Sequence, residues 1–312
     1  MSKITIGMNL SPHWISPAFV PQFAAAGTDA HRIFTGAEGW AERLGNDVLI
    51  SYKTDAARDE ILGGLDEWCS EAGLMADRVF ARFLAKQNAD RVSPVLVRGD
   101  AERSIETVVT ENHLRYGIDF SAGYSAGLFI DQRANRLFLQ KRSADRVLNT
   151  FSYTCSFSVV AAQAGAKTVS IDLSGKSLTR GKANFALNGL DVAGHKFIAD
   201  DVLEVLPRMI RKKELFDAII LDPPTFSRGA RGKRFQAEEN LTDLLRLGLQ
   251  FAAPGAAILL STNCTRIDTS LLQRIARSEL RVAARQGKLH YTEALPDFPA
   301  GAGARTVWLL LV

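Results

Sequence analysis

Short apolar runs alternate with longer amphipathic stretches through the second half of the chain. The runs occur in RVLNTF, TVSIDL, KFIADD, FDAIILDPP and AAILLSTN, between residues 146 and 263. Because they are apolar on both sides, they suit strands that are buried between two layers of helices. The alternation therefore predicts an α/β fold with a doubly wound, mostly parallel sheet and helices on both faces.

The same pattern continues to residue 312. A helical periodicity covers Asp268–Arg285, and two closing runs, HYTEAL (290–295) and RTVWLLLV (305–312), are predicted to be strands. The last run lacks polar alternation, which is typical of a central strand. The sheet is therefore predicted to have about seven strands.

The first half of the chain has a different pattern. Apolar residues recur at helical spacing between Ile61 and Ala72, and four runs have the character of strands: RVFARFL, SPVLVRG, ETVVTEN and LRYGIDF, with Glu111-Asn112-His113 as a turn between the last two. These features predict a smaller α+β domain over residues 1–125, a linking helix over 126–145 and the α/β domain over 146–312. On the linking helix four basic residues are expected on the polar side, namely Arg133, Arg136, Lys141 and Arg142.

Composition and charge narrow the class of protein. Of the 312 residues, 46% are hydrophobic and 23% charged, enough for buried cores. The net charge of +4 and the pI of about 9.0 permit an anionic partner without demanding one.

Cysteine usage and hydropathy bear on the compartment. Cys69, Cys155 and Cys264 are widely separated and show neither a disulfide framework nor a zinc-site spacing, so a reducing cytoplasm and no metal are expected. No apolar stretch approaches the roughly 18–20 residues that span a bilayer, so neither export nor membrane insertion is expected.

A turn of small and polar residues follows the first predicted strand of the α/β domain. It runs from Asn149 to Phe157 and reads NTFSYTCSF. A dinucleotide needs a close backbone approach to its pyrophosphate, which the glycines of G-x-G-x-x-G permit and this turn lacks. The turn therefore disfavours a nicotinamide or flavin oxidoreductase.

Acidic residues follow the next two strands. Asp172 ends the second strand, where a carboxylate can accept both hydrogen bonds of a ribose diol, and Ser174 comes soon after it. Asp201 follows the third strand, where it can meet an adenine amino group while the amide of Val202 donates to the ring. Each of these residues can equally cap the helix that follows it.

A third acid stands in the rigid sequence Asp222-Pro223-Pro224-Thr225-Phe226. The two prolines fix the backbone and remove two amide donors, which leaves carbonyl acceptors at the end of a strand. Such a corner suits a planar group that carries N–H donors. The alternative interpretation is a strand that simply ends at prolines.

These segments resemble class I S-adenosylmethionine-dependent methyltransferases, and more narrowly the bacterial 23S ribosomal RNA large-subunit methyltransferases of the I and K/L types. Further matches are Gly127–Arg133, GLFIDQR, similar to the family's G-x-[FY]-[IL]-D-Q-R segment, and the hairpin at Glu111. The similarity covers residues 105–312 and extends weakly to His31–Gly36. The family's N-terminal PUA module is not recognisable, and Cys155 stands where the family has glycine; if that position needs a positive φ, its Cβ costs about 1 kcal/mol.

The resemblance implies a role for each matching residue. The turn would flank the methionine part of S-adenosylmethionine, Asp172 would hold the ribose and Asp201 the adenine. Gln132 and Arg133 would reach the edge of the cofactor, and Arg133 suits its carboxylate. Asp222, Pro223 and Pro224 would face the target base. The expected cofactor-binding set is Gln132, Arg133, Asn149, Phe151, Ser152, Tyr153, Thr154, Cys155, Ser156, Asp172, Leu173, Ser174, Asp201, Val202 and Asp222.

The identity of the acceptor atom depends on Cys264. A base nitrogen needs only a lone pair in line with the methyl group, whereas cytosine C5 becomes nucleophilic only after a thiolate adds at C6. Cys264 follows the fifth strand, where type I relatives have their nucleophile, but DPPTFS and Asp297-Phe298 look more like the guanine-modifying K/L type. The cysteine could also be a small buried hydrophobic residue, so the alternatives stay open.

A basic loop lies directly after the Asp-Pro-Pro corner. Its cations could neutralise phosphates, and Phe226 or Phe235 could stack on a flipped or unpaired base. The alternative is a solvated loop. The residues expected to contact RNA are Phe226, Arg228, Arg231, Lys233 and Arg234.

The sequence thus predicts a methyltransferase that acts on a base of RNA, most specifically 23S ribosomal RNA. A protein or small-molecule acceptor and a noncatalytic RNA-binding module are the alternatives. A homodimer is expected only from the habit of the family.

Overall fold

The computed structural model describes residues 12–85, 92–229 and 234–312, with the side chain of Arg228 left out. By their contacts these residues form two units. The first is Met1–Ile130 with Leu295–Ala302, and the second is Asp131–Ala294 with Gly303–Val312. This division differs from the predicted boundaries at 125 and 145. The linking helix belongs to the second unit, and a segment from the end of the chain belongs to the first.

The first unit is built on a six-stranded sheet in the order β1-β2-β3-β4-β5-β6. Neighbours are antiparallel except β4 and β5, which are parallel and joined by α2 (Asp55–Ala72). The strands are β1 (His13–Trp14), β2 (Ala30–Thr35), β3 (Gly39–Leu44), β4 (Asp47–Tyr52), β5 (Arg78–Phe83) and β6 (Val95–Arg98). A 3-10 turn (Pro17–Phe19) and α1 (Val20–Ala25) connect β1 and β2.

Helix α2 covers one face of this sheet, as its spacing predicts. Its buried side includes Ile61, Leu65 and Trp68, which pack in one apolar cluster with strand residues. The hydroxyl of Thr54 accepts a hydrogen bond from the amide of Ala57 at the start of the helix. Gly73 ends the helix in the left-handed conformation, a common C-terminal stop.

The hairpin of β7 (Glu106–Glu111) and β8 (Leu114–Asp119) also belongs to the first unit. Its turn residues Asn112 and His113 both have positive φ, as a two-residue hairpin turn requires, so the predicted turn is confirmed. The Phe120 ring, just beyond β8, stacks on Phe80 of β5 with ring centroids 3.8 Å apart. This segment therefore packs on the sheet face that carries Phe80.

The second unit contains the predicted seven-stranded sheet, in the order β11-β10-β9-β12-β15-β17-β16. Five neighbouring strands are parallel, and β17 is antiparallel to both of its neighbours. The strands are β9 (Arg146–Thr150), β10 (Lys167–Asp172), β11 (Lys196–Ala199), β12 (Phe216–Leu221), β15 (Ala252–Thr262), β16 (Gly287–His290) and β17 (Arg305–Leu311). The strand order reverses between β9 and β12, so the sheet is doubly wound.

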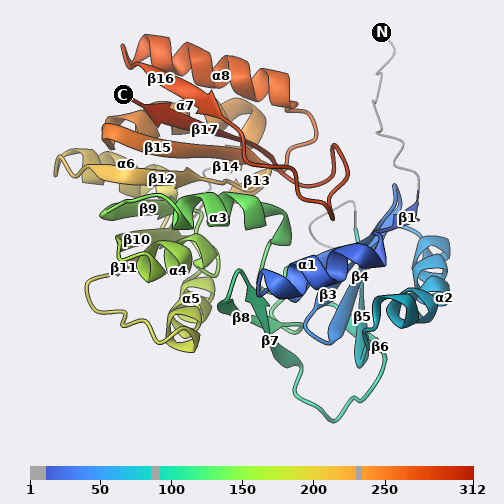
Figure 1. The fold of residues 1–312 in the computed structure, drawn as a ribbon. Coiled ribbons are helices and arrows are strands. Elements are labelled where there is room, and N and C mark those ends of the chain that lie inside the picture. The colour runs from blue at the N-terminus through green and yellow to red at the C-terminus, as the bar shows by residue number, and fades with distance from the viewer. Residues whose placement is uncertain (1–11, 86–91, 230–233) are drawn as a thin grey trace, which may run out of the picture. The chain divides into compact units, whose positions relative to one another are not determined.

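Helices cover both faces of this sheet (Figure 1). One layer is formed by α3, α4 and α5, and the other by α6, α7 and α8. The second layer packs on β12 and β15 in a large apolar cluster. The helices are α3 (Arg133–Gln140), α4 (Ser156–Gln163), α5 (Gly175–Leu187), α6 (Val202–Ile210), α7 (Ala237–Gln250) and α8 (Thr269–Val282).

Three expectations about these elements need correction. Of the strand predicted over 290–295, only His290 is in β16, because the chain leaves the sheet there and residues 295–302 pack in the first unit. The linking helix is shorter than predicted, a 3-10 turn (Ile130–Gln132) followed by α3. Arg133 and Arg136 are buried rather than on a solvated side, because α3 packs on α4. The last run is an interior strand, as predicted.

The described residues offer neither a membrane-spanning helix nor a cluster of metal ligands. None of their helices is long and apolar enough to cross a membrane. No group of His, Cys, Asp and Glu side chains among them could hold a metal ion.

Candidate active site

The turn between β9 and α4 has an unusual backbone. Phe151, Tyr153 and Cys155 have φ of 51°, 46° and 60°, so three residues that are not glycine lie in the left-handed region. Each such residue costs about 1 kcal/mol. Cys155 therefore has the positive φ that would make its Cβ costly, and the turn carries strain.

Helix α5 supports this turn. Asn184 donates a hydrogen bond of 2.9 Å to the carbonyl oxygen of Thr154. Gly181 leaves room for Cys155, because a Cβ at Gly181 would lie only 2.5 Å from the Cys155 Sγ. The thiol is fully buried, and burial raises its pKa to about 11. Cys155 is therefore a packing residue in its neutral form.

Asp172 connects the turn to β10. Its Oδ2 accepts a hydrogen bond of 2.8 Å from the amide of Tyr153, and its Oδ1 accepts one of 2.8 Å from the amide of Ser174. Burial raises the pKa of the carboxyl, and these two amides act against that rise. Each oxygen keeps a lone pair, which can accept from a ribose hydroxyl.

The residues after β10 and β11 cap helices. Ser174 accepts from the amide of Ser177 at the start of α5, and Asp201 accepts from the amide of Leu203 at the start of α6. Leu173 is exposed, whereas Val202 is buried. The capping alternative is thus present at Ser174 and Asp201, and Asp201 keeps its second oxygen for a ligand.

A buried polar network holds Asp222 at the end of β12. Gln132 donates from Nε2 to the Ser261 Oγ at 2.8 Å and to the Asp222 Oδ2 at 3.2 Å. Asn135 donates to the Gln132 Oε1 at 2.8 Å, and the indole of Trp308 donates to the Asn135 Oδ1 at 2.9 Å. The ends of β12 and β15 are thereby linked to α3.

Sequence reasoning found Gln132 and Asp222 but missed their supports. Asn135 follows Gln132 at i+3, which places both on one helix face, and that spacing was the available signal. Ser261 and Trp308 lie on separate strands, so only the tertiary structure brings them to this network.

The environment of Asp222 changes its protonation. Burial raises its pKa to about 6, and the nearby Asp131 acts in the same direction. Hydrogen bonds from Ser261 and Gln132 and the charge of Arg136 partly oppose that rise. Next to it Pro223 is buried and Pro224 exposed. Asp222 is therefore a carboxyl that titrates close to neutral pH.

Two arginines of α3, Arg133 and Arg136, are buried, and the contacts of Arg136 reach the start of α4. Arg136 donates from Nη1 to the Ser156 Oγ at 3.4 Å, and its guanidinium lies 5.7 Å from the centroid of the Phe157 ring. Ser156 is the first residue of α4, directly after the turn. The sequence predicted Arg133 as the partner of the cofactor's carboxylate. Arg136 is a second candidate for that role, because it places its charge beside the turn.

Cys264 is buried in the apolar cluster beneath α7 and α8. Its thiol donates to the Glu238 Oε1 at 3.4 Å, and the same oxygen pairs with Arg266 at 2.5 Å. The amide of Cys264 donates to the Thr262 Oγ1 at 3.1 Å. The side chain thus has the surroundings of a packed core residue, with one carboxylate as its polar partner.

The basic loop forms a hairpin of β13 (Phe226–Arg228) and β14 (Arg234–Gln236). Its predicted RNA contacts Arg231 and Lys233, and the side chain of Arg228, lie outside the described residues. Phe226 is half-buried and Arg234 exposed. Phe235 is buried and packs on Phe151 with centroids 5.4 Å apart, so its expected stacking on a base is wrong.

The described residues fit a nucleoside cofactor that carries a carboxylate. Acceptors for a ribose and an adenine stand after β10 and β11, and the buried guanidinium of Arg136 stands beside the turn after β9. The sheet is doubly wound, and an acid follows each of three successive strands. The turn after β9 has no dinucleotide motif. Together these features define a class I methyltransferase.

Comparison with known proteins agrees with this class. A model of the S-adenosylmethionine-dependent methyltransferases matches residues 80–311. Ribosomal RNA large subunit methyltransferase I of Aeromonas salmonicida is 37% identical over 198 residues, which are 62% of this chain and 50% of the relative. Ribosomal RNA large subunit methyltransferase K/L of Psychrobacter sp. is 39% identical over 181 residues, 55% of this chain and 22% of the relative.

A solved structure shares the fold over nearly the whole chain. It is a methyltransferase crystallised with S-adenosylhomocysteine, with a TM-score of 0.79 and 24% identity, covering 96% of this chain and 82% of its own. The chain belongs to the S-adenosylmethionine-dependent methyltransferases, and S-adenosylmethionine is its cofactor. It spans about half the length of the type I relative.

Proposed function

We propose that the chain methylates a nitrogen of a base in large-subunit ribosomal RNA, at the corner formed by Asp222, Pro223 and Pro224. The relatives named above support the RNA class. The observation that carries the choice of atom is the half-buried Asp222 carboxyl, which Gln132 orients and whose pKa desolvation raises to about 6.

The corner is suited to a planar base that carries N–H groups. The prolines provide carbonyl acceptors and no amide donors, and ionised Asp222 is also an acceptor. S-adenosylmethionine supplies an electrophilic methyl group when it is bound. The chain aligns the acceptor nitrogen with that methyl, and the N–C bond forms as the C–S bond breaks. Asp222 accepts the hydrogen bond of the base and can take the proton that the nitrogen then loses.

The cofactor residues keep the roles that their positions favour. We assign Asp172 to the ribose, because its free lone pairs face away from the two amides that hold it. Asp201 is assigned to the adenine amino group. The carboxylate of the cofactor is assigned to the guanidinium groups of Arg133 and Arg136.

One observation favours a second candidate, methylation of cytosine C5. The Glu238 carboxylate accepts the hydrogen bond of the Cys264 thiol and can therefore remove its proton. The thiolate would add at C6, C5 would take the methyl, and loss of the C5 proton would expel the thiolate again. The burial of Cys264 in the core makes this the less favoured chemistry.

Nucleoside mass spectrometry tests the proposal. Ribosomal RNA from a strain that lacks the protein is incubated with the enzyme and S-adenosylmethionine carrying a deuterated methyl group. We expect a labelled N-methyl nucleoside that persists in Cys264→Ala and falls at least about 100-fold in Asp222→Asn. Asp243→Asn, which changes an exposed carboxylate of α7, is the matched control.

Other results would change the assignment. Labelled 5-methylcytidine that disappears in Cys264→Ala would establish the second candidate. Absence of label from every nucleoside would refute an RNA acceptor.

A further inference from the structure

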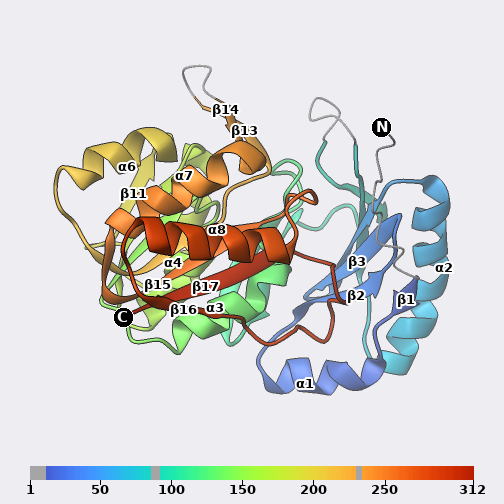
Figure 2. The same ribbon diagram turned by 90° about the horizontal axis from the view of Figure 1, so that it is seen from above.

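One side of α8 carries a row of exposed arginines. Arg274, Arg277 and Arg281 are spaced at i, i+3 and i+7, so they share one face of the helix. All three are exposed, whereas Leu272 and Leu280 on the opposite face are buried in the core. Figure 2 shows α8 on the outside of the second unit, beside α7. The row is therefore turned towards solvent.

One carboxylate acts on this row, because Asp268 interacts electrostatically with Arg274. Arg274 donates to the Ser270 hydroxyl at 3.0 Å, and within the described part of the chain no ion pair reaches Arg277 or Arg281. Asp268, the N-cap of the helix, also accepts hydrogen bonds from the amide of Leu271 and from the Ser270 hydroxyl.

Several other arginines of the second unit have acidic partners. Arg146 pairs with Glu214, Arg208 with Asp200, and Arg246 with Asp243 and Glu279. Like charges one turn apart on a helix cost a few tenths of a kcal/mol each. The neighbouring charges of Arg277 and Arg281 thus carry a local electrostatic cost that a bound polyanion would remove.

Helix α8 follows the edge of the sheet that carries the candidate site, and Arg274 lies in the second turn of that helix. Leu221, the residue before Asp222, pairs with Leu260 near the end of β15, and the chain from that end leads into α8. From Arg274 to Arg281 the helix rises about 10 Å, which corresponds to roughly three phosphates of one nucleic acid strand.

We propose that Arg274, Arg277 and Arg281 bind backbone phosphates of the RNA substrate, outside the target nucleotide. The inference rests on the proposed function. The planar guanidinium of arginine binds phosphate through two parallel hydrogen bonds, which suits this contact better than lysine. Contacts to phosphates position the RNA and raise affinity without selecting sequence.

The salt dependence of RNA binding tests the proposal. The variant Arg274→Gln/Arg277→Gln/Arg281→Gln is compared with Arg211→Gln/Lys212→Gln/Lys213→Gln, which changes exposed cations after α6. Each lowers the formal net charge by three, from +4 to +1. Binding of deproteinised 23S ribosomal RNA is measured by filter retention between about 50 and 200 mM KCl.

We expect the slope of log K against log salt to become shallower by about 2 to 3 in the α8 variant, at roughly 0.7 to 0.9 per lost phosphate contact. The control should keep the wild-type slope, and Arg→Lys at the same three α8 positions should nearly keep it. Thermal unfolding shows that the variants are folded. Equal slopes in the α8 variant and the wild type, or an equal loss in the control, would overturn the proposal.

The proposed function can fail independently. The proposed function fails if the wild-type enzyme transfers no labelled methyl group to RNA. The comparison of salt slopes measures binding alone and needs no methyl transfer.

Discussion

Asp222 shows how one side chain's environment sets its chemistry. Its carboxyl follows a buried strand, stands beside a buried proline and accepts a hydrogen bond from Gln132. Burial raises its pKa to about 6, so the group is mostly ionised at pH 7 and mostly protonated at pH 5. The anionic carboxylate, which is the strong acceptor of base N–H groups and the base that can take a proton, is therefore present mainly above that pKa.

The pH dependence of activity follows from this protonation. We expect kcat/KM for methyl transfer to fall as pH falls through about 6, by about tenfold one unit below the pKa. RNA affinity measured at the same pH values separates binding from chemistry. An activity that stays level down to pH 5 would contradict the role given to Asp222.

The contribution of Asp222 to the free energy of unfolding should change with pH in the direction opposite to its contribution to activity. The folded pKa of about 6 lies above the ordinary value of 3.8, so between about pH 4 and 6 the folded state holds a proton that the unfolded state has lost. The contribution of this carboxyl to stability thus falls as pH rises through that window.

Asp222→Asn should accordingly be more stable than the wild type at pH 7, by about 1–2 kcal/mol. The gain should shrink towards zero at pH 4. Urea unfolding at both pH values measures it, and a gain of the same size at both would mean that titration of this group is not the cause.

Single residues at strand ends were the part of the site that the sequence could predict. Asp172, Asp201 and Asp222 stand out because each follows an apolar run that the chain pattern identifies as a strand. The arginine at position 136 could not be assigned in this way, because helical spacing alone placed it on the polar side. Its burial depends on the packing of α3 against α4, which spacing does not reveal.

At the scale of elements, α5 packs closely on the turn after β9 at one pair of residues, Gly181 and Cys155. The strained Cys155 occupies the space that the absent side chain of Gly181 leaves free. The pair explains how a residue with a Cβ can stand at φ 60° next to a helix.

A double-mutant cycle tests this fit. Gly181→Ala should cost about 1–3 kcal/mol in the free energy of unfolding, because its Cβ would overlap the Cys155 side chain. In the Cys155→Gly background most of that cost should disappear, because the atoms that clash with the new Cβ belong to the Cys155 side chain. The next atom that the Cβ would meet is the Thr154 carbonyl carbon, at 3.4 Å.

Gly63→Ala is the matched control for this cycle. Nothing lies within 4 Å of a Cβ at that exposed position of α2, so alanine should be neutral or slightly stabilising there. Additive effects of the Gly181 and Cys155 changes would contradict the proposed fit.

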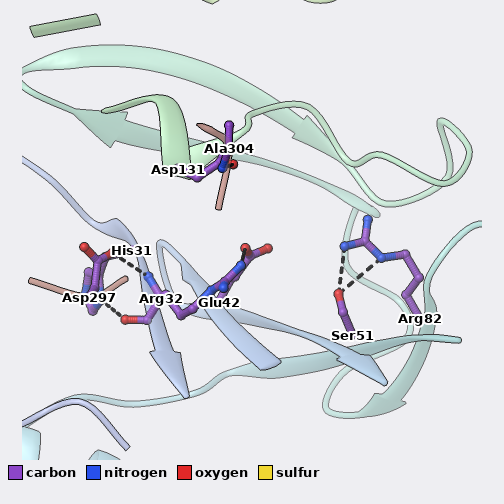
Figure 3. Close-up of polar contacts among 8 residues, drawn as sticks. All are labelled: His31, Arg32, Glu42, Ser51, Arg82, Asp131, Asp297 and Ala304. Atoms are coloured by element: carbon purple, nitrogen blue, oxygen red, sulfur yellow. Dashed lines mark hydrogen bonds and ion pairs between the residues drawn. The ribbon is translucent and has the colours of Figure 1, made fainter. Parts of the chain in front are cut away.

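Most of the elements that the sequence pattern predicted have apolar buried faces. The strands of the second unit and α2 have this property, and the structure contains them. Strands β2 and β4 were missed because buried polar residues interrupt them: His31 and Arg32 in β2, Asp47 and Ser51 in β4. Their partners lie far away in sequence, as with Asp47 and Arg78. The same holds for Ser51 and Arg82, which Figure 3 shows.

At the scale of the whole molecule, the chain passes between its two units after Ile130, Ala294 and Ala302. The short segment Leu295–Ala302 completes the first unit. Asp297 is fully buried and its Oδ2 accepts a hydrogen bond of 2.9 Å from the amide of Arg32 (Figure 3). The Phe298 ring lies 4.2 Å from the Arg32 guanidinium.

Removing this acceptor should loosen β2 in particular. Asp297→Ala leaves a buried amide of Arg32 without its partner and should cost about 1–3 kcal/mol. Asp297→Asn keeps an acceptor and should cost less. Hydrogen exchange of β2 amides, followed by mass spectrometry, reports the local effect, and unchanged protection of β2 in Asp297→Ala would contradict it.

The position of this segment has a consequence for synthesis of the protein on the ribosome. A nascent chain is made from its N-terminus, and domains commonly fold in that order as they emerge. Here strand β2 is made early, but the carboxylate that pairs with its amide at Arg32 is made only after nearly all of the second unit. The unit that is translated first is therefore the one that must wait to be completed.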